Sequence, residues 1–157
     1  MAKKIEKNFE ELMFENRERL KELAAINKTT SIIKENKPIN DTIQHICLIL
    51  PNAMQYPDNT EARIEFGDYH SETPKYDKKG KEKLEKEFKS IDNITGKISI
   101  HYTKSFPEKH QGPFLAEEIN MLDNVVSLLT GYINSFKAQE VFKKTKSARF
   151  EIGNENE

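Results

Sequence analysis

Residues 114–136, FLAEEINMLDNVVSLLTGYINSF, carry a strict heptad of apolar side chains. The spacing alternates between four and three residues, which places these side chains on one face of a helix. We therefore predict a closing helix from about Phe114 to Lys144, and Pro113 suits its start because the first turn does not need the missing N–H. The heptad positions are Leu115, Ile119, Leu122, Val126, Leu129, Ile133 and Phe136.

A second apolar stripe lies beside the heptad on the same predicted helix. It consists of Met121, Val125, Leu128 and Tyr132. Either the two stripes form one broad core face, or one packs on a sheet and the other on a partner helix. We favour the second interpretation, which predicts a homodimer joined through the first and last helices. The predicted interface residues are the seven heptad positions together with Leu20 and Leu23 of the first helix.

Length and composition favour one domain with a core of its own. The chain has 157 residues, of which 36% are hydrophobic and 32% charged, and its net charge is -1. A charge so close to zero gives no overall attraction to nucleic acid or to an anionic membrane. Cys47 is the only cysteine and stands in the apolar run ICLIL, so we expect a buried thiol in a reducing compartment.

The first half of the chain reads as two helices. Apolar residues recur every three or four positions from about Lys3 to Lys34, and Asn16 and Asn27 fall on or near this stripe. Such asparagines either set the register of a helix pair or mark the rim of the stripe. The segment NKPIND then ends the first helix, and we expect Asn40 or Asp41 to cap a second one.

Alternating patterns between the second and the closing helix predict strands. Residues 62–66 alternate apolar and polar side chains, and Tyr69 follows a Gly-Asp turn as the start of a partner strand. Residues 83–91 are compatible with a strand or a short helix, and we favour the strand. Residues 98–102 give the clearest alternation. The predicted order is therefore two helices, strands, a helix and a frayed tail, which is an α+β protein.

The sequence offers no recognisable catalytic or metal-binding motif. It has no phosphate-binding glycine loop, no nucleophile elbow and no zinc-protease motif. The four histidines, His45, His70, His101 and His110, are read as surface or hydrogen-bonded side chains rather than ligands. The six lysines between Lys78 and Lys89 are interleaved with three glutamates, which favours a solvated segment over a nucleic-acid site. We therefore expect no enzyme activity, no cofactor, no metal and no nucleic-acid partner.

The N-terminal segment is charged and has no apolar core. We therefore expect no signal peptide, no membrane span and a cytoplasmic protein.

Six segments, taken in order, carry a resemblance to a known family. They are RLKELAAINKTTSIIKE, INDTIQHICLILPNAMQYPD, EARIEF, ETPKY, GKISIHYTKSFPE and GPFLAEEINMLDNVVSLLTGYI. Together they resemble a GAF-like sensory domain of the type that precedes bacterial and archaeal histidine kinases and phosphoenolpyruvate-synthase-like proteins. The likeness covers about Arg19 to Gln139. This chain departs from the family where a tryptophan often follows ETP, because it has Lys75 and Tyr76 there.

The resemblance implies an antiparallel β-sheet flanked by helices, with long N- and C-terminal helices that often pack in a dimer. It implies residues 1–18 as a helical extension, 19–142 as the GAF-like domain and 143–157 as a flexible tail. It also implies a non-catalytic sensory or regulatory module of signal transduction that binds an unidentified small ligand or a partner signalling protein, such as a histidine kinase. The alternative from the sequence is a purely structural dimerisation or adaptor domain without a ligand.

Overall fold

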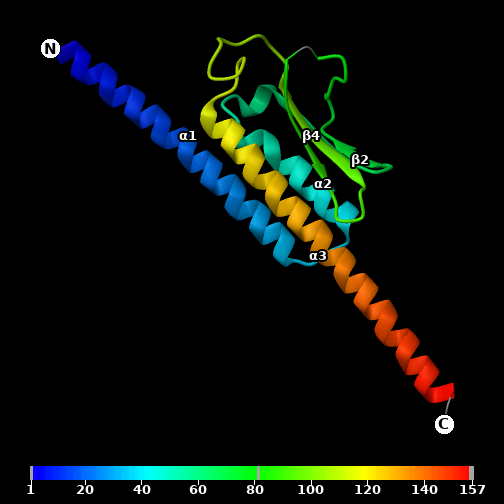
Figure 1. The fold of residues 1–157 in the computed structure, drawn as a ribbon. Helices are drawn as coiled ribbons and strands as arrows, with labels where there is room; N and C mark the ends of the chain where they lie inside the picture. The colour runs from blue at the N-terminus through cyan, green and yellow to red at the C-terminus, as the bar shows by residue number, and fades with distance from the viewer. Residues whose placement is uncertain (1, 81, 156–157) are drawn as a thin grey trace.

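A four-stranded antiparallel sheet packs against α-helices on one side (Figure 1). The structure is a computed structural model that describes the backbone of residues 2–80 and 82–155 and the side chains of residues 6, 8–80 and 82–146. The fold is α+β, as the sequence predicts. Its elements are α1 (Ala2–Lys34), α2 (Ile39–Ile49), η1 (Leu50–Ala53), η2 (Pro57–Asn59), β1 (Thr60–Phe66), β2 (Tyr69–Glu72), β3 (Lys83–Lys89), β4 (Thr95–Tyr102) and α3 (Ala116–Glu155).

The strand order is β2-β1-β4-β3, and every neighbouring pair is antiparallel. The strands predicted at residues 62–66 and 98–102 are confirmed, and Ile64 faces Ile98 across the β1–β4 ladder with both side chains fully buried. Burial alternates along β1 but not over residues 98–102, where Ser99 and His101 are buried as well. Residues 83–89 form a strand, so the favoured interpretation of that segment is correct. Gly67 at the β1–β2 turn has a φ of 57°, which is the left-handed conformation that glycine adopts without strain.

The helices form two layers over the apolar face of the sheet. Helix α2 packs on β1 and β2, α3 packs on β3, and α1 lies outside them against α3 and α2 (Figure 1). The core is a single cluster that contains side chains from α1, α2, all the strands except β2, and α3. The opposite face of the sheet is polar, and none of the described helices packs on it.

Helices α1 and α3 run side by side in the same direction (Figure 1). The Tyr132 hydroxyl of α3 donates to the carbonyl of Lys37, just after α1 ends, and Glu22 lies near Glu117 at the start of α3. In both pairs the α3 residue is 95 positions further along the chain. The N-terminal part of α1 and the C-terminal part of α3 therefore project from opposite ends of the body.

Two helix boundaries differ from the sequence predictions. Helix α2 begins at Ile39, with Pro38 rather than Asn40 or Asp41 at its N-cap, because the Pro38 carbonyl already accepts the first helical hydrogen bond from Thr42 at 3.1 Å. Helix α3 does not end near Lys144 but continues to Glu155, since residues 137–152 contain neither proline nor glycine. The expected tail is thus helical up to residue 155, and residues 156–157 lie outside the described part.

Candidate functional site

The heptad of α3 lies inside a single subunit. Five of its positions are buried in the core and Ile119 and Phe136 are half-buried, while the second stripe is buried as well except for the half-buried Leu128. The two stripes therefore form one broad face that packs on the sheet and the other helices. This corrects the prediction that the α3 heptad faces a partner chain, since exposing it would unpack the core. The five buried heptad positions are Leu115, Leu122, Val126, Leu129 and Ile133.

The predicted interface residues of α1 lie in a different environment. Leu20 is 66% exposed and Leu23 is 50% exposed. Phe9 and Met13 continue the same line toward the N-terminus and are also exposed. With Asn16 and Asn27 these residues are spaced four, three, four, three and four apart. We call this set, Phe9, Met13, Asn16, Leu20, Leu23 and Asn27, the α1 stripe.

The opposite side of α1 fixes the helix to the body. Ala25, Thr29 and Ile32 are buried there. Glu18 is also buried, and its Oε1 pairs with Lys21 Nζ at 3.2 Å, while Lys21 donates to the Met54 carbonyl at 3.3 Å. Because the buried side is occupied by the body, the α1 stripe is free to meet another surface.

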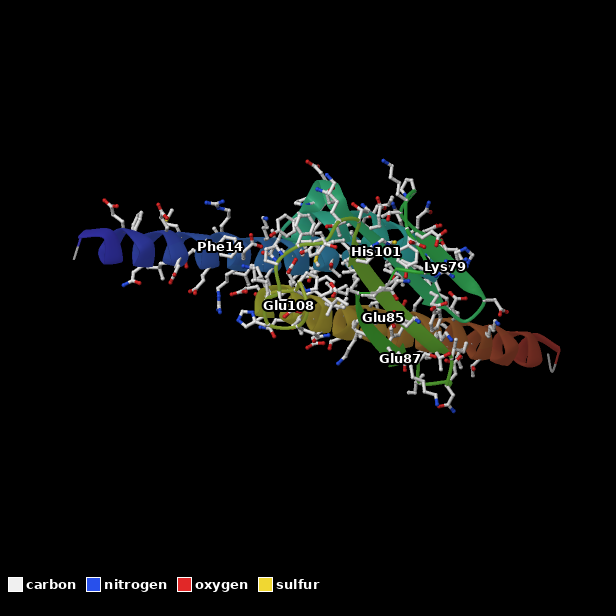
Figure 2. The ribbon with its side chains drawn as sticks, turned by 90° about the horizontal axis from the view of Figure 1, so that it is seen from above. Phe14, Lys79, Glu85, Glu87, His101 and Glu108 are labelled. Carbon is white, nitrogen blue, oxygen red and sulfur yellow. The ribbon has the colours of Figure 1, made fainter. Side chains whose placement is uncertain are left out.

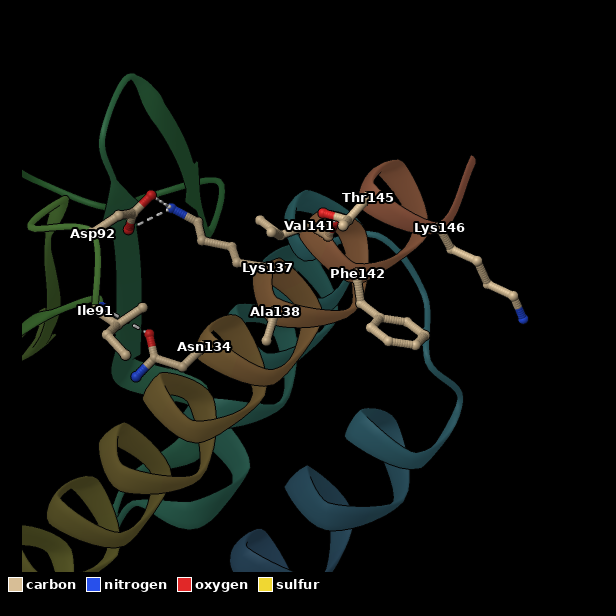
Figure 3. A pocket seen from close by; sticks show the side chains of 9 residues that line it. All are labelled: Ile91, Asp92, Asn134, Lys137, Ala138, Val141, Phe142, Thr145 and Lys146. Carbon is tan, nitrogen blue, oxygen red and sulfur yellow. Dashed lines mark hydrogen bonds and ion pairs between the residues drawn. The ribbon is translucent and has the colours of Figure 1, made fainter. Parts of the chain in front are cut away.

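A second exposed apolar surface lies where α3 leaves the body (Figure 3). A groove of about 740 Å³ runs between the β3–β4 turn and α3, with Ile91, Val141 and Phe142 among its exposed apolar side chains. Two contacts hold the turn against the helix. Lys137 Nζ pairs with Asp92 at 2.7 Å, and the Ile91 N–H donates to Asn134 Oδ1 at 2.8 Å.

The helix-free face of the sheet carries a paired charge network. Arg63 Nη1 binds Glu72 at 2.7 Å, and Lys97 Nζ lies 3.7 Å from Glu65 and 3.6 Å from Glu85. Partial burial opposes the charge of Lys97, but these two carboxylates outweigh it and hold its pKa above the usual value. Figure 2 shows Glu85 and Glu87 side by side on this face. The charges largely satisfy one another, so the face is not an open charged site.

At one end of this face His101 holds the loop between β2 and β3. The ring is only 4% exposed, its Nε2 accepts the Asp77 N–H at 3.0 Å, and its Nδ1 lies 3.1 Å from the Tyr102 carbonyl. These partners require a neutral ring that donates from Nδ1 and accepts at Nε2. The interpretation of His101 as a hydrogen-bonded histidine is confirmed, and its role is to position the loop.

Glu118 joins three segments at the N-terminus of α3. The carboxylate is 1% exposed and accepts hydrogen bonds from Leu115 N at 2.8 Å, Gln55 N at 2.9 Å and Gln55 Nε2 at 3.0 Å. The Tyr102 hydroxyl donates to the same carboxylate. Burial, and then the hydrogen bond and negative charge of Glu118, raise the pKa of Tyr102 above its ordinary range. Both carboxylate oxygens of Glu118 accept hydrogen bonds from donors of the protein itself. The cluster therefore holds the segment at Gln55, the end of β4 and the start of α3 together.

Cys47 is an inert core thiol. Its Sγ lies 3.4 Å from the Ser71 carbonyl and 3.5 Å from the Ala62 carbonyl, and burial raises the pKa of the thiol to about 11. A thiol with such a pKa is a poor nucleophile near neutral pH. Among the residues that the structure describes, no group of three or more His, Cys, Asp or Glu side chains is arranged to hold a metal ion.

The sequence already contained the signal for the α1 stripe. Its four-three spacing equals that of α3, but two of its six positions are asparagines, which weakens the apolar pattern. The groove beside Ile91 had no such signal, because it forms between segments more than forty residues apart, such as Ile91 and Asn134.

No family model matches this chain, and no match is found among curated proteins. Within the described residues, none of the helices combines the length and the apolar character needed to cross a membrane.

Proposed function

We propose that this protein is a non-catalytic regulatory module that acts as a homodimer, with the α1 stripe at its interface. The observation that carries the proposal is the exposed heptad of α1, which lies opposite the side that packs on the body. A row of large apolar side chains at this spacing is typical of a helix–helix interface. The proposed interface thus retains the residues of the first helix that the sequence predicts, and it no longer includes the α3 heptad.

The projecting turns of α1 support a partner. An isolated helix shorter than about 12–15 residues is marginal in water, and most helical stability comes from packing an apolar face. The turns around Phe9 and Met13 extend beyond the start of α3 (Figure 1). A second chain would cover Phe9, which is 63% exposed, and would stabilise these turns.

The regulatory part of the proposal rests on two features. One is the resemblance of the segments to GAF-like sensory domains. The other is the arrangement of α1 and α3, which project from opposite ends of one body and pack side by side within it. A small shift or rotation of one helix against the other is a known way to pass a signal between such ends. A signalling protein, such as a histidine kinase, is the partner class that fits this role.

The second candidate function is a structural dimerisation or adaptor domain without a ligand. It is favoured by the helix-free sheet face, where Arg63 and Lys97 are paired with glutamates instead of facing an open site. A thermal-shift screen with cyclic nucleotides and small metabolites separates the two functions. Stabilisation by one compound class supports the sensory module, and its absence throughout supports the adaptor.

The dimer itself is tested by changing the α1 stripe. Light scattering at micromolar concentration should give the mass of two chains for the wild type. The double variant Leu20→Glu/Leu23→Glu should give the mass of one chain, because a dimer of this variant would bury unpaired carboxylates in its interface. Both side chains are at least half exposed, so the variant should retain its fold by circular dichroism.

Leu48 supplies a matched control. It is 54% exposed on α2, away from the α1 stripe, so Leu48→Glu makes a similar change at a similar exposure. This variant should keep the dimer mass. A wild-type chain that remains monomeric over the whole concentration range would remove the proposed function, and a dimer unaffected by the α1 changes would place the interface elsewhere.

A further inference from the structure

We infer that the two copies pair antiparallel, so that the projecting part of α1 in one copy lies on the projecting part of α3 in the other. This inference rests on the proposed homodimer and assigns its orientation and contact surfaces. We call residues 6–15 the α1 arm and residues 137–146 the α3 arm.

The two arms carry opposite charge. The α1 arm, EKNFEELMFE, has four glutamates and one lysine, a net charge of -3. The α3 arm, KAQEVFKKTK, has four lysines and one glutamate, a net charge of +3. In the part of the chain that the structure describes, Glu10, Glu11 and Glu15 form no ion pair, and neither do Lys143, Lys144 and Lys146. These six side chains are exposed, and the three glutamates also line a pocket with Lys109 of the loop before α3.

Each arm also exposes large apolar side chains. Phe9 and Met13 lie on the α1 arm, and Val141 and Phe142 lie on the α3 arm beside the groove at Ile91. Figure 3 shows the Phe142 ring pointing away from the sheet, with Lys146 beyond it on the same arm. An apolar strip flanked by acidic side chains on one arm therefore matches an apolar strip flanked by basic side chains on the other.

The geometry allows both contacts to form at once. Since α1 and α3 are parallel and project from opposite ends, a two-fold rotation that reverses one copy places each α1 arm beside the partner's α3 arm. With the offset of 95 positions given by the Tyr132–Lys37 contact, Ala116 lies level with residue 21 of α1, and Lys34 lies level with residue 129 of α3. Residues 2–20 of α1 thus extend past the start of α3 by about 28 Å, and residues 130–155 of α3 extend past the end of α1 by about 39 Å, at a rise of about 1.5 Å per residue. The two-fold rotation makes the two arm contacts equivalent, so the assembly closes as a dimer.

A parallel pair would oppose like charges. It would place two α1 arms of charge -3 together at one end and two α3 arms of charge +3 together at the other. Like charges across an interface disfavour that pairing, so the charge pattern selects the antiparallel orientation. Raising the ionic strength should therefore weaken the antiparallel dimer and would strengthen a parallel one.

A charge-swap experiment tests the orientation. The acidic triple change is Glu10→Lys/Glu11→Lys/Glu15→Lys, and the basic triple change is Lys143→Glu/Lys144→Glu/Lys146→Glu. Each triple variant alone should raise the dimer dissociation constant by about tenfold or more at low salt, because it places like charges between the arms. The chain that carries all six changes should recover wild-type dimerisation. All six side chains are exposed, so circular dichroism should show retained folding.

Cross-linking gives an independent readout of the same orientation. Chains with Glu11→Cys, mixed with chains with Lys144→Cys, should form a disulfide between the two kinds of chain under oxidation, whereas Glu11→Cys chains alone should not. A monomeric wild type would overturn the proposed function. A dimer in which Glu11→Cys chains link to one another, or in which six changes fail to restore what three remove, would overturn only the antiparallel orientation. Masses that grow beyond two chains would indicate an open chain of contacts and would also overturn it.

Discussion

The rings of Phe66 and Phe88 stack with their centroids 6.0 Å apart, although the two residues lie on strands that are not neighbours. Gly96 of β4 stands between them, paired with Phe66 on one side and with Phe88 on the other. A Cβ atom at Gly96 would lie 2.3 Å from the Phe88 ring. The two rings therefore cover the glycine and fill the space that a side chain would occupy.

This arrangement predicts that Gly96→Ala destabilises the protein. The added methyl group must displace the Phe88 ring from a packed core, at a cost of about 1–3 kcal/mol in the free energy of unfolding. Urea unfolding followed by circular dichroism measures the change. Gly131→Ala is the matched control: nothing lies within 4 Å of the new methyl group, and it sits inside α3. That variant should be more stable by roughly 0.5–1 kcal/mol.

The sequence predicted which segments form helices and strands better than it predicted which of these elements contact one another. The apolar spacing in α3 correctly indicated a helix with one buried face. Such a spacing predicts that the face is buried, but it does not identify the segment that packs on it. Within a single chain, α1 and the sheet cover the face that the sequence interpretation assigns in part to a partner. The α1 stripe is the opposite case. Asn16 and Asn27 weaken its apolar pattern, yet its leucines are exposed and form a candidate interface.

Contacts between distant segments were beyond the reach of the sequence. The network of Arg63 depends on the register that sets it beside Glu72 on β2, and strand register is decided by the whole sheet. Glu118 stands beside Glu117 in the sequence, and nothing in the local pattern distinguishes the two carboxylates. Glu118 is buried because the segment at Gln55 and the end of β4 close over it, which no local pattern of the helix reveals.

Removing the Glu118 carboxylate should destabilise the protein strongly. Glu118→Ala leaves the Gln55 N–H, the Leu115 N–H and the Tyr102 hydroxyl without their acceptor. Unsatisfied buried donors cost about 1–3 kcal/mol each before relaxation, so we expect a loss of about 3 kcal/mol or more in chemical unfolding. Glu117→Ala changes the next residue of the same helical turn and should cost less than about 1 kcal/mol. Equal effects of the two variants would contradict the proposed role of Glu118.

Cys47 should make stability fall in alkaline solution. The folded state raises the pKa of the thiol from 9.0 to about 11, so between these values the folded chain keeps a proton that the unfolded chain has lost. The stabilisation that the protonated thiol gives the folded state is therefore fully present below about pH 9 and is lost as the pH rises through about 11. Unfolding free energies measured across this window should fall less steeply for Cys47→Ala than for the wild type. Identical slopes would show that the thiol does not titrate differently on folding.

The contact between His101 and Asp77 predicts a local effect on the loop between β2 and β3. Phenylalanine fills a similar space but cannot accept the Asp77 N–H, so His101→Phe should free this part of the loop while the sheet remains folded. Hydrogen exchange should show the Asp77 amide exchanging at least about tenfold faster, and the global free energy of unfolding should fall by only about 1 kcal/mol. His70→Phe makes the same change at an exposed histidine of β2 and should leave the Asp77 amide unaffected. His101→Gln retains an acceptor and should restore part of the protection. Unaltered exchange at Asp77 in His101→Phe would mean that other contacts hold the loop.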